Sequence, residues 1–125
     1  MLAEAGCIVS AETAPSAAAV GGRAIVGNRA VAIVSLDRCQ GRLAVRNRRP
    51  GDRFHPRGVR GRTKLQDYFV NRKVARERRD GVPLVVDETD RIVWVVGHAI
   101  DEDFRVTDPA QAVLVLRLKL LGGTA

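Results

Sequence analysis

Apolar and polar residues alternate most clearly near the end of the chain, where leucine occupies every second position from 114 to 120. Arg117 and Lys119 are among the residues between these leucines. A period of two is typical of a β-strand that buries one face and exposes the other. The pattern therefore predicts a strand with one buried face here, followed by a frayed tail at residues 122–125.

Shorter apolar runs predict further strands. Two runs rich in β-branched residues, 84–86 and 91–96, flank the polar segment 87–90 and predict a β-hairpin. Three more strands are predicted in the first third of the chain, at 7–9, 24–26 and 30–36. Gly27-Asn28 lies between the last two, and because both residues tolerate positive φ we expect a hairpin turn there.

Another strand is predicted at residues 42–46, where Leu43 and Val45 alternate with Arg42, Ala44 and Arg46. The alternation places the two apolar side chains in the core. We therefore expect the guanidinium groups of Arg42 and Arg46 to point outward.

One helix is clearly indicated after residue 62. Thr63-Lys64-Leu65-Gln66 has the spacing of a capping box, in which the Thr63 hydroxyl and the Gln66 side chain bond to amides of the first turn. Leu65, Tyr68 and Phe69 follow at helical spacing and predict a buried face, with Lys64, Asn71 and Arg72 on the exposed face. The helix start is expected to favour a phosphate.

A second helical turn is predicted at 76–80, stopping at Gly81. Tyr68 and Phe69 could serve as stacking platforms for bases, but on a short helix with one apolar face we expect both in the core. Trp94, between valines of a strand, is also expected in the core. Several strands with one or two short helices indicate an α+β fold.

Charge is distributed unevenly along the chain. From Arg42 to Arg79, 14 Lys and Arg residues against 3 acids give +11 in 38 residues, whereas the other 87 residues carry −4 and the whole chain +7. Such a field attracts a polyanion, most commonly a nucleic-acid backbone. Arginine outnumbers lysine 18 to 3, which is typical of a coding bias, so the alternative is that the basic segment is an ordinary solvated face. A coding bias alone would not, however, remove acids from one segment.

Length and composition narrow the class of protein. A chain of 125 residues suits one domain with its own core, but it is small for separate cofactor and substrate domains. No run approaches the roughly 18 to 20 apolar residues of a membrane span, and no secretory signal precedes Arg23. Cys7 and Cys39 fit reduced, buried thiols in a cytoplasmic protein, with a single disulfide as the alternative.

The residue types needed for catalysis or metal binding do not occur at suitable spacings. His55 and His98 lack a Cys or carboxylate at zinc-ligand spacing, and the acids at 101–103 are expected to form a solvated turn. We expect His55 to contact RNA and His98 to be structural. No GxxxxGK[ST] loop is present for ATP. The loop from Gly58 to Gly61 matches the glycine clamp of one RNA-binding module, which also needs a preceding helix.

Several short motifs occur in a fixed order between residues 48 and 97. They are Arg48-Arg49-Pro50-Gly51-Asp52-Arg53-Phe54, then Pro56, Gly58 and Gly61, then Lys64-Leu65-Gln66-Asp67-Tyr68-Phe69, Lys73-Val74, Arg76, Pro83-Leu84-Val85 and Ile92-Val93-Trp94-Val95-Val96-Gly97. In this order and spacing the chain resembles the C-terminal domain of bacterial tRNA(Ile)-lysidine synthetase, closely over about 42–106. The resemblance implies a small α+β domain with an antiparallel β-sandwich-like core.

The resemblance also implies a function. Enzymes of this family use ATP with Mg to activate a cytidine in the anticodon of a minor isoleucine tRNA, and then join lysine to it. Their catalytic domain carries an SGGxDS loop that is absent from this chain, so the chain is expected to be non-catalytic alone, with no cofactor or metal of its own. Residues 42–125 would form the family domain, with 1–41 supplying N-terminal strands and an Ala-rich loop within one structural unit.

The leading hypothesis is therefore a tRNA-binding accessory domain that contacts the acceptor-stem region through phosphates and sugars. The expected contact residues are Arg46, Arg48, Arg49, Arg53, Arg57, Arg60, Arg62, Lys64, Arg72, Lys73 and Arg76. Gly51, Gly58 and Gly61 would shape the loop, with Asp52 organising it through amides or an arginine. The alternative is a module that packs against the catalytic domain of the same synthetase or forms a homodimer. The third hypothesis is a stand-alone enzyme, but the sequence offers no nucleophile paired with a base.

Overall fold

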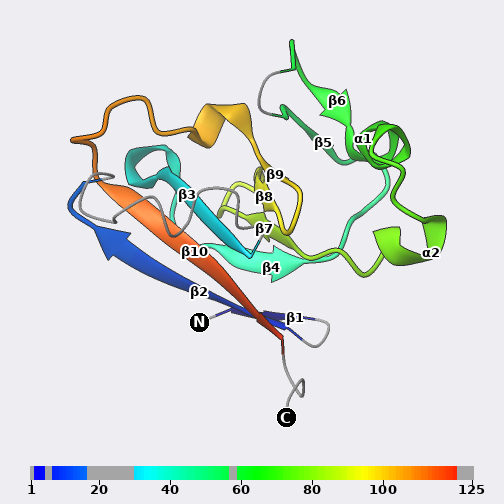
Figure 1. Ribbon diagram of the computed structural model, residues 1–125, viewed down its shortest axis with the longest axis horizontal. Coiled ribbons are helices and arrows are strands. Elements are labelled where there is room, and N and C mark those ends of the chain that lie inside the picture. Colours follow the sequence, from blue (N-terminus) through cyan, green and yellow to red (C-terminus); the bar gives the residue numbers. More distant parts are fainter. Residues whose placement is uncertain (1, 5–6, 17–29, 57–58, 121–125) are drawn as a thin grey trace.

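Two four-stranded antiparallel sheets and a two-stranded ribbon form the β-structure of this computed structural model, which describes residues 2–4, 7–16, 30–56 and 59–120 (Figure 1). The first sheet has the order β1 (Leu2–Glu4), β2 (Cys7–Ala14), β10 (Val113–Leu120), β3 (Val31–Ser35). The second has the order β4 (Ala44–Arg46), β7 (Leu84–Val86), β8 (Ile92–Val95), β9 (Ala99–Ile100). The ribbon pairs β5 (Arg53–Phe54) with β6 (Thr63–Lys64).

Within the described residues, four short helical segments complete the fold. They are α1 (Leu65–Asn71), α2 (Arg76–Arg79) and the 3-10 turns η3 (Leu36–Arg38) and η4 (Glu102–Phe104). Antiparallel sheets with few helices confirm the predicted α+β class.

The second sheet is the middle layer of the molecule. In Figure 1 the strands β2, β10 and β3 lie on one side of β7 and β8, and α1 with the ribbon lies on the other. Along β7, Val85 belongs to the core shared with the first sheet, whereas Leu84 and Val86 belong to a second core beneath α1. Because both faces of β7 and β8 are covered, their sequences are apolar throughout instead of alternating.

Trp94, with 3% of its surface exposed, lies in the core between the two sheets, as predicted. The predicted hairpin of residues 84–86 and 91–96 is also present, with a register irregularity between Val85 and Val86.

Strand β10 corrects one prediction. It is the central strand of the first sheet, bonded to β2 on one edge and to β3 on the other. Residues 113–116 are all buried, so the first half of this strand is covered on both faces instead of one. The leucine alternation correctly marks a strand, but the neighbours that cover its second face are contributed by distant parts of the chain.

The start of α1 corrects another prediction. Thr63 lies in β6, and the residue at the N-cap is Lys64, with no side-chain hydrogen bond to the first turn. The predicted capping box is therefore wrong, because the ribbon holds Thr63 in extended backbone. The predicted buried face is confirmed: Leu65, Tyr68 and Phe69 are 1%, 8% and 0% exposed.

Some predictions concern residues that the structure does not describe. These are the hairpin around Gly27-Asn28, most of the Ala-rich loop and the tail at 122–125. Within the described part, Cys39 is a free thiol. Burial and the nearby Asp87 carboxylate raise its pKa to about 11 against the opposing effect of Arg91, so it stays protonated at neutral pH.

Candidate nucleic-acid interface

The β5–β6 ribbon has one apolar face and one cationic face. Phe54 pairs with Thr63 and is fully buried in the core beneath α1. One position along each strand, Arg53 lies directly opposite Lys64, and both are exposed. Because successive side chains of a strand point to opposite faces, burial of Phe54 forces these two cations outward together. Neither forms an ion pair with any acid in the described ranges.

Asp101 ties this ribbon to the second sheet. Its carboxylate, only 3% exposed as a residue, accepts hydrogen bonds from the amide of His55 at 2.9 Å and from the amide of Asp103 at 2.8 Å. The Glu102 amide donates to the His55 carbonyl at 2.7 Å. Asp101 is therefore a buried organiser, which corrects the expected solvated turn at 101–103. Among the described residues, no group of three His, Cys, Asp or Glu side chains is placed to hold a metal ion.

The segment preceding the ribbon is held by Arg46. Its guanidinium donates to both carboxylate oxygens of Asp52 at 2.9 Å, and its Nε donates to Asp90 at 3.0 Å. The residue is only 9% exposed, so the expectation that its guanidinium points outward is wrong. The loop formed by residues 47–52 folds over it, which local alternation cannot reveal.

Asp52 bonds to the backbone on both sides of the ribbon. Its Oδ2 accepts the amide of Arg49 at 2.7 Å, and its carbonyl accepts the amide of Leu65 at 2.9 Å. Burial raises the pKa of Asp52, but the hydrogen bonds from Arg46 and from the Arg49 amide outweigh it and leave the pKa below its usual value. The same ion pair raises the pKa of Arg46. Gly51 at φ 85° and Gly61 at φ 71° occupy left-handed backbone at which a Cβ is strained.

Two further arginines of this loop are partly neutralised by acids distant in sequence. Arg48 Nε lies 2.7 Å from Asp80, whose carbonyl also accepts the side-chain amide of Asn47 at 2.8 Å. Arg49 Nη1 lies 3.3 Å from Asp90, and its side chain is 62% exposed. Arg49 consequently presents more free charge to solvent than Arg48, whose side chain is 25% exposed.

Three of the predicted contact residues lie in or beside the helices and are exposed. Arg72 lies with its Cζ 5.8 Å from the centroid of the Tyr68 ring, within cation-π range. Lys73 follows with φ 58°, and Arg76 begins α2. After α1, the Lys73 amide donates to the Val70 carbonyl and the Val74 amide to the Phe69 carbonyl, both at 3.0 Å. This is a Schellman ending in which lysine takes the place usually held by glycine.

The structure leaves most of the predicted cations exposed and removes others from the surface or pairs them with acids. The exposed ones are Arg49, Arg53, Arg60, Arg62, Lys64, Arg72, Lys73 and Arg76. Arg46 is buried, and Arg48 is tied to Asp80. Arg57 and Gly58 lie outside the described residues. The loop containing Gly61 follows a strand, β5, and not the helix that a glycine clamp requires.

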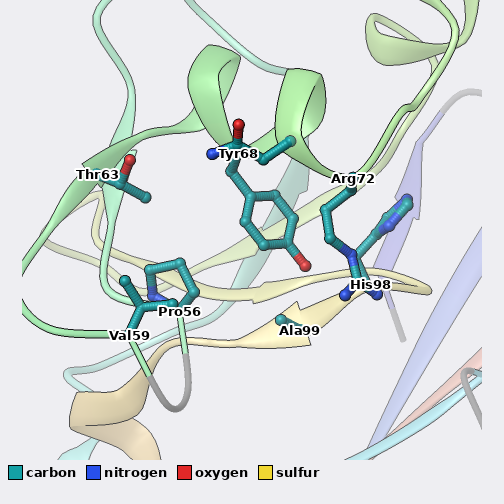
Figure 2. Close-up of a pocket in the computed structure, with 8 residues that line it drawn as sticks. Pro56, Val59, Thr63, Tyr68, Arg72, His98 and Ala99 are labelled. Carbon is teal, nitrogen blue, oxygen red and sulfur yellow. The ribbon is translucent and has the colours of Figure 1, made fainter.

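A cleft opens beside this cationic ribbon (Figure 2). It has a volume of about 350 Å³ and is lined by Pro56, Val59, Thr63, Tyr68, Asn71, Arg72, His98 and Ala99. Figure 2 shows the Tyr68 ring between Thr63 on one side and Arg72 with His98 on the other. His98 packs edge-on against the rings of Tyr68 and Phe69, at centroid distances of 6.4 and 5.8 Å.

Sequence reasoning missed the organising roles of Asp80, Asp90 and Asp101. Each lies 32 to 46 positions from the arginine or amide that it holds, so no local spacing marks it. Asp90 has a positive φ, and the sequence indicates this in one way: Asp tolerates left-handed backbone, and Asp90 ends a polar turn. The Tyr68 cleft was missed for the same reason, because its walls come from the ribbon, α1 and the turn before β9.

Comparison with known proteins agrees with this fold. A solved structure described as the crystal structure of a TILS C-terminal domain covers 95% of this chain and 88% of its own, with a TM-score of 0.75 and 24% identity. An N-terminal fragment of the phenylalanyl-tRNA synthetase β-subunit from Pyrococcus horikoshii aligns over 89% of this chain and 38% of its own, with a TM-score of 0.68 and 13% identity. At these identities the likeness concerns the fold alone.

Sequence relatives share the name tRNA(Ile)-lysidine synthase. That of Caldanaerobacter subterraneus subsp. tengcongensis is 44% identical over 80 residues, which are 64% of this chain and 17% of that protein. That of Symbiobacterium thermophilum is 55% identical over 69 residues, 55% of this chain and 14% of that protein. The chain thus spans about one sixth of the length of these relatives. Residues 43–118 match the TilS substrate C-terminal domain family, and the chain belongs to that family.

Proposed function

We propose that this chain is the tRNA-binding accessory domain of a tRNA(Ile)-lysidine synthase. The observation that carries the proposal is the Arg53–Lys64 pair on the ribbon. Like charges directly opposite each other on paired strands repel, so the free ribbon is destabilised by them. A phosphate bound between the two side chains would remove that repulsion. The absence of an acid partner for either cation within the described residues leaves both charges available to RNA.

The proposed surface extends from the ribbon to the helices. It comprises Arg49, Arg53, Arg60, Arg62, Lys64, Arg72, Lys73 and Arg76, with Arg48 at its margin and Arg57 included on sequence grounds. A double-stranded stem presents shape, phosphates and 2′-hydroxyls more than readable base edges. Arginine suits this because its planar group bonds phosphate through two N–H groups. The acceptor-stem region of a tRNA is the partner that this chemistry favours.

The rest of the enzyme would supply the chemistry. We infer a parent ligase that uses ATP with Mg to join lysine to the anticodon cytidine of a minor isoleucine tRNA in the cytoplasm. In this arrangement the domain grips one end of the tRNA while a separate catalytic domain works on the anticodon. No helix in the described part of the chain is long and apolar enough to cross a membrane.

A titration tests the proposal directly. The purified chain is mixed with minor isoleucine tRNA, and separately with a DNA duplex of equal length, at several salt concentrations. Four to seven phosphate contacts predict that log K falls with log salt at a slope of roughly −4 to −6. Tighter binding to tRNA than to DNA, with such a slope, is the expected result. Salt-insensitive binding, or a dimer in ultracentrifugation without RNA affinity, would favour an interdomain or dimerisation module instead.

Matched variants locate the interface. Arg53→Ala and Lys64→Ala should each lower the salt slope by about one unit. Arg38→Ala is the control, because Arg38 is also exposed, in η3, but lies outside the proposed surface. An equal effect of all three variants would show that net charge alone governs binding and would remove the ribbon from the site.

A further inference from the structure

The Tyr68 cleft, lined by the eight residues of Figure 2, adjoins the cationic ribbon but is built differently from it. Thr63 lies in its wall next to Lys64 of the ribbon, and Asn71 and Arg72 come from the last turn of α1. At about 350 Å³ the cleft is near the lower end of the volumes that hold small ligands, roughly 300–1,000 Å³. It is large enough for one nucleotide and too small for a duplex.

The walls of the cleft combine apolar surface with open polar groups. Pro56 and Ala99 line it, and Val59 is one of two described valines about half exposed, at 48% beside 51% for Val70. The Thr63 hydroxyl and the Asn71 amide form no side-chain hydrogen bond within the described residues. Arg72 forms no ion pair there and lies against the Tyr68 ring. A few polar groups on a wall that also offers apolar surface are typical of a ligand site.

We infer that this cleft binds a single unstacked nucleotide of the RNA. Its base would lie against Val59 and Pro56, with its polar edge at the Thr63 hydroxyl and the Asn71 amide. Its phosphate would meet Arg72. Unpaired bases are held in RNA-binding proteins by apolar or aromatic contacts and by hydrogen bonds to their edges, next to a cation that meets the backbone. The inference rests on the proposed function and adds a single-stranded contact to the duplex surface.

The charge of the surroundings favours a nucleotide over a neutral ligand of the same size. Lys64 and Lys73, both exposed, lie at the two ends of α1, which forms one wall of the cleft. Of the acids near it, Asp67 is exposed on α1, and Asp101, which pairs with Pro56, is buried with its carboxylate bonded to the His55 and Asp103 amides; neither lines the cleft. A neutral ligand gains nothing from this field, whereas a phosphate gains from every cation around it.

Two RNA duplexes of about one helical turn, one blunt and one with a single unpaired nucleotide at its end, test the inference on the 125-residue chain. Stacking of one base against the cleft should tighten binding about tenfold. Asn71→Ala and the cleft-filling Ala99→Met should remove most of that gain while leaving affinity for the blunt duplex unchanged. Gln66→Ala, on the same helix but outside the cleft, should keep the gain.

Each outcome decides the question. Equal affinity for the two duplexes, or a gain that survives both cleft variants, would overturn the inference while the proposed function stands. If neither duplex binds, the proposed function fails. The chain is then titrated with adenosine and cytidine monophosphates, and amide NMR shifts report whether a nucleotide binds in the cleft. Shifts confined to Tyr68, Asn71 and His98 would support a nucleotide site, and their absence would overturn it. Asn71 is exposed, so Asn71→Ala tests binding even if Ala99→Met fails to fold.

Discussion

Arg46 and Asp52 form a two-point ion pair in which only 11% and 13% of the two side chains are exposed. The same guanidinium reaches Asp90 in the turn between β7 and β8. Arg46 therefore fastens the loop formed by residues 47–52 to the second sheet. An arginine of the basic segment thus supports the loop that carries Arg48 and Arg49.

Replacing Asp52 with Ala should lower the free energy of unfolding by about 3 kcal/mol, since removal of one partner leaves a buried charge poorly compensated. Asp90 remains as a partner of Arg46, which places the effect at the lower end of such losses. Urea unfolding monitored by Trp94 fluorescence measures it. A loss below about 0.5 kcal/mol would mean that the pair contributes no more than a surface salt bridge.

Acid should destabilise the protein through Asp52 and Asp87. Burial raises the pKa of Asp87, but hydrogen bonds from Thr89 and Arg91 outweigh it, so its pKa, like that of Asp52, lies below the usual value. A carboxylate with a lowered folded-state pKa stabilises the protein above its unfolded-state pKa of about 4 and loses that contribution as pH falls through the folded value. The free energy of unfolding should therefore decline below about pH 4, with a shallower decline in Asp52→Asn.

Lys64→Glu should separate stability from binding. A carboxylate opposite Arg53 replaces a repulsive cross-strand pair with an attractive one, which should stabilise the ribbon by about 0.2–1 kcal/mol. RNA affinity should fall, with a salt slope reduced by at least about one unit. Lys64→Gln removes the repulsion without adding an attraction. Its free energy of unfolding and its RNA affinity should therefore both lie between those of the original protein and those of Lys64→Glu. A variant that binds RNA as tightly as the original would exclude Lys64 from the interface.

Lys73→Gly should stabilise the protein and weaken RNA binding. Left-handed backbone costs a residue with a Cβ roughly 1 kcal/mol or more, and glycine is free of that cost. Thermal unfolding should therefore show a gain of about 1 kcal/mol, and salt titration a slope lower by about one unit. Lys73→Asn is the control, because Asn tolerates this backbone but carries no charge. Unchanged stability in Lys73→Gly would show that the strain is relieved elsewhere.

Several elements of the fold are readable from the sequence because their causes are local. The spacing of Leu65, Tyr68 and Phe69 marks the buried face of α1, and the β-branched runs mark β7 and β8. The capping box predicted from Thr63 is wrong, because pairing with β5 holds Thr63 in a strand. The hydrogen bonds that another strand supplies outweigh the conformational preference of a single residue.

The candidate site likewise has one feature that the sequence predicts and one that it does not. The partner class that we propose rests on the uneven charge between residues 42 and 79, which the sequence alone shows. The Tyr68 cleft does not follow, since the ribbon, α1 and the turn at His98 meet only in space.

The sequence by itself determined where β7, β8 and β10 lie, which face of α1 is buried and which sign of charge dominates the basic segment, because periodicity and net charge depend on neighbouring residues alone. Only the tertiary structure decided which cations remain available. Arg46 forms ion pairs with Asp52 and Asp90, and Arg48 forms one with Asp80. Arg53 and Lys64 instead face the solvent together. Ion pairs form by distance in space, and acids 32 and 44 positions away come within 3 Å of an arginine only after the sheets have assembled.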